Sequence, residues 1–181
     1  FLKDYEPDMM WTGSAAPYPI DPCELMGAQY IRFPGPTFKR PLNAPFQILD
    51  GTYMEDDEFD EFLTDPTHFM ITKVMPRKYK NLSALSKLYG REIYDTSVLM
   101  EIATLGDHDV KDAIHLLIQC GEMCKRFAQQ LRYISELVEE AGFPTRGGTI
   151  LAPFDSYADS LRGLVQSLLD VKEIPDLVLE T

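Results

Sequence analysis

The sequence predicts an α/β fold that is rich in helix and holds one long amphipathic helix. Apolar residues recur at alternating spacings of three and four across one long segment, which is the pattern of an amphipathic helix. Short apolar runs bounded by glycine or proline are typical of buried strands. One such run, Gly147–Ala152, breaks at Pro153 and leads into a second helical pattern.

Composition and charge limit the class of protein. With 181 residues, 45% of them hydrophobic, the chain suits a single domain with a substantial core. Its 17 basic and 29 acidic residues give a formal net charge of −12, which argues against nucleic acid or an anionic membrane as partner. No apolar stretch is long enough to span a bilayer. Three cysteines make no even disulfide framework, so we expect a cytoplasmic location.

The first 50 residues predict short strands and one short helix. Met9–Thr12 is an apolar run that we interpret as a buried strand. Asp21–Met26 predicts a helix, because aspartate is a good N-cap and Pro22 suits the first helical position. Tyr30–Phe33 and Phe46–Leu49 predict two strands joined by a proline-rich loop or hairpin.

An acidic run without lysine or arginine extends from Asp50 to Asp65. Acidic side chains are favoured near helix N-termini, so the run predicts the solvated start of a helix, with a cation site as the alternative. The apolar residues Phe59, Phe62 and Leu63 predict one face of a short helix, which ends where the run ends.

Short helices are predicted next. The first covers Phe69–Met75 and ends at Pro76, because proline lacks the amide proton that a helix interior needs. Leu82–Leu88 and Ser97–Leu105 predict two more, each followed by a glycine that can end a helix.

The long helix starts near Asp107 and ends at Gly142. One face carries all of its periodic apolar positions, namely Val110, Ala113, Leu117, Cys120, Cys124, Phe127, Leu131, Ile134 and Val138. Cys120 and Cys124 could ligate a metal, but no His, Asp or Glu shares their face, so we predict that both are buried in the core. A parallel row of mostly small residues, which includes Gly121 and Ala128, predicts close approach of another element.

Four residues are candidates for binding a substrate: Trp11, Phe154, Asp155 and Arg162. They follow or end the predicted strands, and loops at the carboxyl ends of strands converge on a common site in α/β folds. Each has a structural alternative. Trp11 and Phe154 could be plain core residues, Asp155 could be the N-cap of a helix beginning near Ser156, and Arg162 could form a salt bridge. No catalytic triad, zinc-binding spacing or phosphate-binding glycine loop occurs, so the catalytic residues are unknown.

Several short motifs, taken in order, resemble the uroporphyrinogen decarboxylase superfamily. They are Pro7-Asp8, Glu24-Leu25-Met26-Gly27, Pro34-Gly35, Glu55 to Leu63 with Asp65-Pro66, Ala141-Gly142-Phe143-Pro144, Ala152-Pro153-Phe154-Asp155 and Asp159-Ser160-Leu161-Arg162-Gly163. The chain is especially similar to the decarboxylase-like branch that includes corrinoid and coenzyme M methyltransferases. The resemblance implies that residues 1–181 form a single domain, an incomplete portion of a (β/α)8 TIM barrel in a longer protein.

The resemblance also implies a choice of reaction. True decarboxylases carry an essential aspartate after the first strand, and alignment places Gly13 there, followed by Ser14. Neither can stabilise a pyrrole cation, so methyl transfer involving a corrinoid protein or a small thiol is favoured over uroporphyrinogen decarboxylation. The chain itself carries no cofactor pattern. Zinc and a corrinoid partner would belong to the full-length protein.

Two other functional classes stay open. The acidic run and the long amphipathic helix are compatible with a noncatalytic interaction module. A small metal-free hydrolase with Asp155 as its base is the other alternative.

Overall fold

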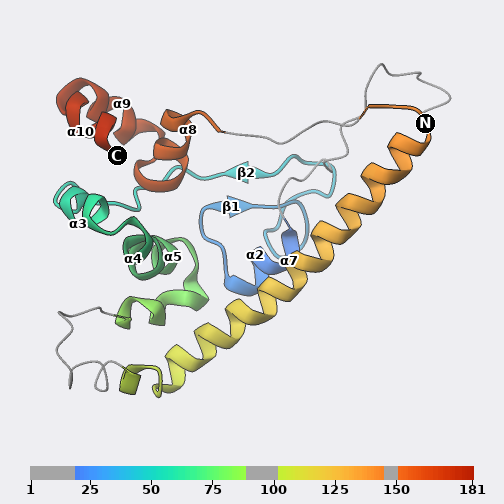
Figure 1. The fold of residues 1–181 in the computed structure, drawn as a ribbon, viewed down its shortest axis with the longest axis horizontal. Coiled ribbons are helices and arrows are strands. Elements are labelled where there is room, and N and C mark those ends of the chain that lie inside the picture. Colours follow the sequence, from blue (N-terminus) through green and yellow to red (C-terminus); the bar gives the residue numbers. More distant parts are fainter. Residues whose placement is uncertain (1–18, 89–101, 145–150) are drawn as a thin grey trace.

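Helices dominate the fold, and one of them, α7, is far longer than the others (Figure 1). The computed structural model describes residues 19–88, 102–144 and 151–181. In Figure 1, α7 runs along one side of the molecule and the C-terminal helices lie on the other. No helix in these three ranges has the length and apolar character needed to cross a membrane.

A short helix and a hairpin open the described chain. Helix α2 spans Ile20–Met26 and ends at Gly27, whose positive φ of 71° closes the helix in the left-handed region. Strands β1 (Ile31–Arg32) and β2 (Gln47–Ile48) pair antiparallel, with Ile31 opposite Ile48. These elements confirm the predicted helix and hairpin, although the strands are shorter. The prediction that Asp21 is the N-cap is wrong, because the helix begins at Ile20 and Pro19 holds the N-cap position.

The acidic run leads into a set of short helices. Helix α3 (Phe59–Thr64) is followed by α4 (Pro66–Phe69), the π-helical turn η1 (Met70–Val74) and α5 (Met75–Lys78). The prediction that Pro76 ends this helix is wrong. The N–H of Met75 donates to the carbonyl of Met70, five residues back, and this wider turn relieves the crowding that a proline ring causes in a regular α-helix.

The next predicted helix is a 3₁₀ helix, η2 (Lys80–Lys87). Its buried residues Leu82 and Leu85 are three apart, which matches the 3₁₀ period. Of the helix predicted at Ser97–Leu105, residues 102–104 are helical and Leu105 lies in a turn, whereas residues 97–101 lie outside the described ranges.

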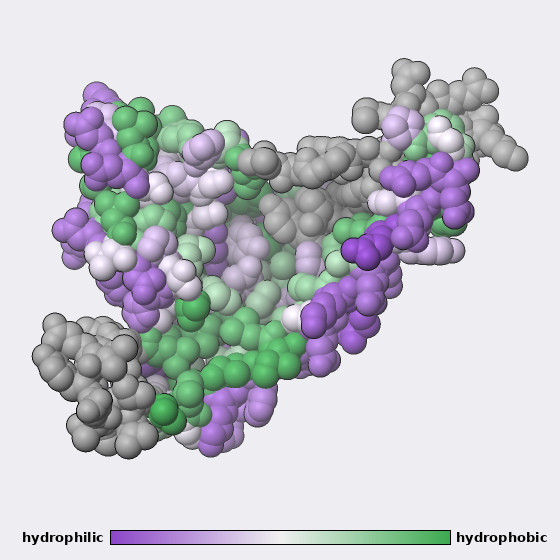
Figure 2. Space-filling view, in the orientation of Figure 1, coloured by the Kyte–Doolittle hydropathy of each residue, from purple (hydrophilic) through white to green (hydrophobic). Residues whose placement is uncertain are grey.

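Helix α7 (His108–Glu140) confirms the predicted long helix, but its predicted burial is wrong in part. Cys120 is buried, whereas Cys124 is exposed and Phe127 and Leu131 are only partly covered. The reason is length: 33 residues extend about 50 Å, and α2 and η2 pack against only part of the helix. Figure 2 shows apolar surface along the inner side of α7 and hydrophilic residues along its outer side.

The close approach predicted along the row of small residues is wrong at Gly121. Gly121 is exposed, and no described atom lies within 4 Å of the position that a Cβ would take there.

The C-terminal segment folds into short helices that return to the acidic run. Helix α8 (Pro153–Tyr157) continues into a π-helical turn, η3 (Ala158–Arg162), and α9 (Leu164–Glu173) and α10 (Pro175–Glu180) follow. The carbonyl of Leu161 accepts the N–H groups of Tyr53 and Met54, at 2.6 and 2.9 Å. Tyr53, Met54 and Leu161 also share one hydrophobic core cluster, so the two segments form one unit.

The two predicted parallel strands lie largely outside the described residues. Met9–Thr12 is not described, and of Gly147–Ala152 only Leu151 and Ala152 are. Both are exposed and neither is in a strand, so the expected burial of this run is wrong at its described end. The β1–β2 hairpin is the only sheet in the described ranges.

Candidate functional site

A cavity of about 830 Å³ lies where the helices of the acidic run meet the C-terminal helices. The lining residues come from or adjoin α3, α4, η1, α8, η3, α9 and α10, and in Figure 1 α3 and α4 lie below the C-terminal helices. The residues that line it are Phe62, Pro66, Met70, Ala152, Pro153, Phe154, Ser156, Tyr157, Ser160, Leu161, Val171, Pro175, Val178, Leu179 and Thr181. None of these carries a charged side chain.

Aromatic rings form two walls of the cavity. Phe154 lies in the first turn of α8, with its ring 6.3 Å from that of Tyr157. On the opposite side, Phe62 meets Phe69 edge to face, with 5.6 Å between ring centroids. Aromatic pairs in such arrangements hold each other in place, so the walls are rigid apolar surfaces.

Some of the few polar groups in the cavity wall have hydrogen-bond partners in the protein and others do not. The Tyr157 hydroxyl donates to Asp170 Oδ2 at 2.6 Å, and the Thr181 hydroxyl donates to the Leu177 carbonyl at 2.9 Å. Ser156 and Ser160 lie four residues apart and both face the cavity. Neither serine hydroxyl has a hydrogen-bond partner among the described residues.

Arg162 lies in the core behind the cavity wall, where it forms ion pairs with Asp170 and Asp56. Its Nε donates to Asp170 Oδ2 at 2.7 Å and its Nη2 to Asp170 Oδ1 at 3.0 Å. The same guanidinium also donates to the Met54 carbonyl and to Asp56. Burial alone would lower the pKa of Arg162, but the hydrogen bonds that its guanidinium donates to Asp170 and Asp56 outweigh burial and raise it. With each nitrogen engaged, the side chain offers no donor to the cavity.

The other sequence candidates are placed differently from one another. Phe154 lines the cavity, and Trp11 lies outside the described residues. Asp155 is exposed and does not line the cavity. Its alternative role as an N-cap is wrong, because α8 begins at Pro153 and Ala152 holds the N-cap position.

One acid of the predicted solvated run is engaged inside the fold. Glu58 accepts two hydrogen bonds from Arg77, at 2.6 and 2.7 Å, and one from the Glu55 amide at 2.8 Å. The Arg77 guanidinium is the main reason that the pKa of Glu58 is lowered to about 2. The three-residue spacing between Glu55 and Glu58 at a helix start was the available signal for this turn.

Lys78 forms a second cluster that sequence reasoning missed. Its Nζ lies 4.6 Å from the ring centroid of Tyr53 and 5.1 Å from that of Tyr30, and it donates to the Asp159 carbonyl at 3.0 Å. Burial lowers the pKa of Lys78 to about 8. The two rings also line a smaller cavity of about 270 Å³. Asp159 is 81 positions from Lys78 in the sequence, so no local pattern indicates this contact.

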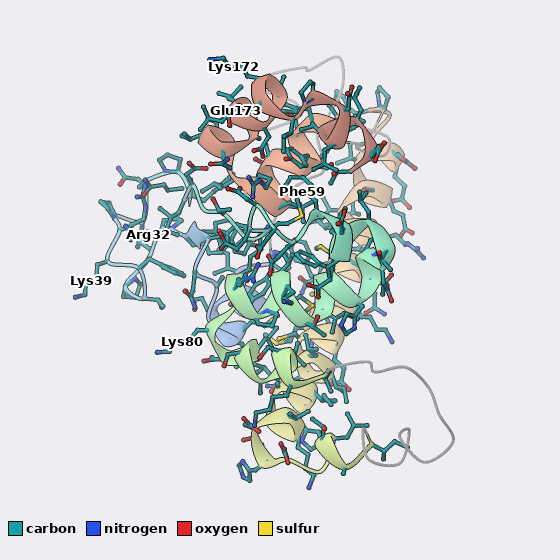
Figure 3. All side chains as sticks on the ribbon, turned by 90° about the vertical axis from the view of Figure 1, so that its left-hand side faces the viewer. Arg32, Lys39, Phe59, Lys80, Lys172 and Glu173 are labelled. Atoms are coloured by element: carbon teal, nitrogen blue, oxygen red, sulfur yellow. The ribbon has the colours of Figure 1, made fainter. Side chains whose placement is uncertain are left out.

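Figure 3 distinguishes side chains that point into the core from charged side chains that point into solvent. Figure 3 shows Phe59 pointing inward beneath the C-terminal helices, where Arg162 lies 5.2 Å above its ring. Arg32, Lys39 and Lys80 point outward in the same view.

The described residues do not fit a zinc ion. They contain no group of three His, Cys, Asp or Glu side chains close enough to hold a metal. Cys120 Sγ lies 3.9 Å from the Pro22 carbonyl, and Cys124 is exposed on α7.

No known protein family, curated protein or solved structure matches this chain. The expected similarity to the uroporphyrinogen decarboxylase superfamily stays a prediction from the order of the short sequence motifs. Two of them, Glu55–Leu63 and Asp159–Gly163, are joined by the Arg162–Asp56 ion pair, and both contribute to the cavity wall.

Proposed function

We propose that this chain supplies a substrate cavity to a uroporphyrinogen decarboxylase-like enzyme with a (β/α)8 barrel, and that the enzyme transfers a methyl group to or from a corrinoid protein or a small thiol. The observation that supports this proposal is the apolar cavity beside Phe154. Phe154 lies two residues after the run Gly147–Ala152, which the sequence predicts as a strand although its described end, Leu151 and Ala152, is not in one. Barrel enzymes bind substrate at the carboxyl ends of their strands.

The chemistry of the cavity favours methyl transfer over decarboxylation of a porphyrinogen. A substrate with several carboxylates needs cationic partners, because an unpaired buried charge is costly. No cation lines the cavity, and Arg162 is held by Asp170 and Asp56. Gly13, at the position of the decarboxylase aspartate, supports the same choice.

The role of this chain in that reaction is binding and exclusion of water. Phe62, Phe154 and Leu161 provide apolar walls that displace solvent from a bound substrate. Because the described residues hold no zinc donor set, the activation of a thiol or a methyl donor is assigned to the rest of the full-length enzyme.

The test is a methyl-transfer assay on the purified full-length protein, with a corrinoid protein or a small thiol as acceptor. Phe154→Ala should lower kcat/KM about tenfold or more, since it removes apolar contact worth about 1.5–3 kcal/mol. Arg126→Ala, on the exposed side of α7, should leave it unchanged. Carbon dioxide release from uroporphyrinogen by the same protein would reverse the assignment.

A noncatalytic interaction module is a second candidate, which the surface of α9 favours. This helix buries Ser167 and Asp170 and exposes Leu164, Val165, Leu168 and Leu169. Contiguous exposed apolar residues are typical of surfaces that contact another protein. Absence of methyl transfer, together with binding of a protein that Leu168→Lys abolishes, would favour this candidate.

A further inference from the structure

We propose that the cavity beside Phe154 selects a neutral, largely apolar small molecule with one hydrogen-bonding group and rejects anions of the same shape. The proposal rests on the proposed function, because it takes this cavity as the substrate site. It adds the chemical class of the ligand.

The exclusion of ions follows from the charges around the cavity. None of the residues that line it is charged, and the nearest cation behind the wall, Arg162, has Asp170 and Asp56 as partners. A carboxylate in the cavity would lose hydration without gaining a counterion, which is unfavourable. The net charge of −12 adds a repulsive field for anions. A cation would likewise find no acidic side chain among the lining residues.

The hydrogen-bonding group follows from the two serines. Ser156 and Ser160 face the cavity from one side of the helix formed by α8 and η3. Their hydroxyls have no partner among the described residues, whereas the hydroxyls of Tyr157 and Thr181 are engaged. A ligand oxygen or amide placed beside the serines would therefore satisfy polar groups that the protein leaves open.

Size and shape indicate a flat ring of moderate size. A volume of about 830 Å³ lies within the range of small-molecule sites. Phe62 and Phe154 stand on different sides of the cavity and present aromatic surface to whatever lies between them.

Three ligands with one ring system test the selection: naphthalene-2-carboxamide, 2-naphthoate and 2-methylnaphthalene. Binding to the full chain is measured at pH 7 by equilibrium dialysis. The carboxamide should bind one to one, with a Kd at least about tenfold below that of the anionic naphthoate. The double variant Ser156→Ala/Ser160→Ala should weaken carboxamide binding about three- to tenfold and leave 2-methylnaphthalene unaffected.

Substitutions in the wall locate the binding. Phe154→Ala should weaken the binding of all three ligands about tenfold. Ser160→Leu, which fills the cavity and keeps Phe154, should weaken their binding to the same extent. Ile134→Ser on the exposed part of α7 is the matched control for binding to other apolar surfaces and should change nothing. Far-ultraviolet circular dichroism confirms that each variant is folded.

The outcomes separate this inference from the proposed function. Equal or tighter binding of naphthoate, or carboxamide binding that survives both Phe154→Ala and Ser160→Leu, would overturn the inference even if methyl transfer is observed. The expected binding pattern without methyl transfer would support the inference and refute the methyltransferase assignment.

Discussion

Arg162 is a charged side chain held in the core by acceptors for each of its three nitrogens. It is 1% exposed and contacts Asp170, Asp56 and the Met54 carbonyl, with Phe59 beneath its plane. Guanidinium groups suit this role because their donors match carboxylates in a fixed planar fork. Tyr157 completes the site by donating to Asp170.

Replacing Arg162 by leucine should destabilise the protein by about 3–5 kcal/mol, because Asp170 would remain buried without its counterion. The free energy of unfolding in urea measures the loss. Arg126→Leu, at an exposed position of α7, is the control and should stay within about 0.5 kcal/mol of the parent protein. Equal effects of the two substitutions would contradict the structural role of Arg162.

Glu58 makes stability depend on pH. Its pKa is lowered from the ordinary 4.5 to about 2, mainly by Arg77, so the folded protein holds the ionised form more strongly than the unfolded chain does. The stabilisation is present above pH 4.5 and is lost as pH falls towards 2, and it amounts to about 3 kcal/mol at most. Urea unfolding at pH 6 and pH 3 should show a smaller difference for Glu58→Gln than for the parent protein.

Glu61→Gln is the matched control for this pH dependence. Glu61 also pairs with Lys73, but its side chain is 40% exposed, compared with 11% for Glu58. Solvent screens exposed pairs, so the control should keep the pH dependence of the parent protein. A parallel loss in both variants would show that the Glu58–Arg77 pair is not its source.

At the scale of elements, the sequence pattern correctly predicted those helices and turns whose formation depends on local sequence. The extent of α7, the cap at Gly27 and the β1–β2 hairpin follow from spacing and turn residues, and all are confirmed. The π-helical turns before Met75 and within residues 158–162 were not predicted, because they depend on packing. Burial along α7 also failed as a prediction at Cys124, since an apolar face shows where a helix can be covered and not how far its neighbours reach.

The three thiols should differ in reactivity according to their position. Burial raises the pKa of Cys23 and of Cys120, whereas Cys124 is exposed on α7. The thiolate is the reacting species, so Ellman's reagent should modify one thiol quickly and two slowly in the native protein. Cys124→Ala should remove the fast phase and change stability by less than about 0.5 kcal/mol. A fast phase that persists in this variant would contradict the arrangement.

At the scale of the whole molecule, Gly163 is the point at which the C-terminal helices pack closely against Asp50 and Gly51, just after the hairpin. Its φ of 76° and ψ of 164° suit glycine, and a Cβ there would lie 2.7 Å from Asp50 Oδ1 and 2.9 Å from the Gly51 carbonyl. Asp50 Oδ1 accepts the Leu164 amide at 2.7 Å and thereby caps α9. The backbones can approach because no side chain separates them.

Gly163→Ala should therefore destabilise the protein by about 2–4 kcal/mol, through backbone strain and loss of this contact. Gly121→Ala offers the opposite case, because the site is open and helical, and it should stabilise by about 0.5–1 kcal/mol. Thermal unfolding of the two variants beside the parent protein gives both signs in one experiment. A stabilising Gly163→Ala would exclude the close approach.

Separation along the sequence explains which parts of the site could be predicted. Phe154 follows a recognisable break at Pro153, so its place at the cavity was predictable from local sequence. The partners of Arg162 at Asp56 and Met54 lie 106 and 108 positions away. No local pattern reports such contacts, and the engagement of Arg162 was consequently visible only in three dimensions.

The ion pair between Asp56 and Arg162 also sets an order of events during synthesis. Glu58 and Arg77 are 19 positions apart and can meet soon after they leave the ribosome. Asp56 and Arg162 are 106 positions apart, so at ribosomal speeds the first waits roughly 5–20 s for the second. Throughout that interval Tyr157 and Leu161 do not yet cover the core around Phe59, so the nascent chain exposes apolar surface of the kind that chaperones bind. Tyr157 and Leu161 therefore complete a core that the first half of the chain began.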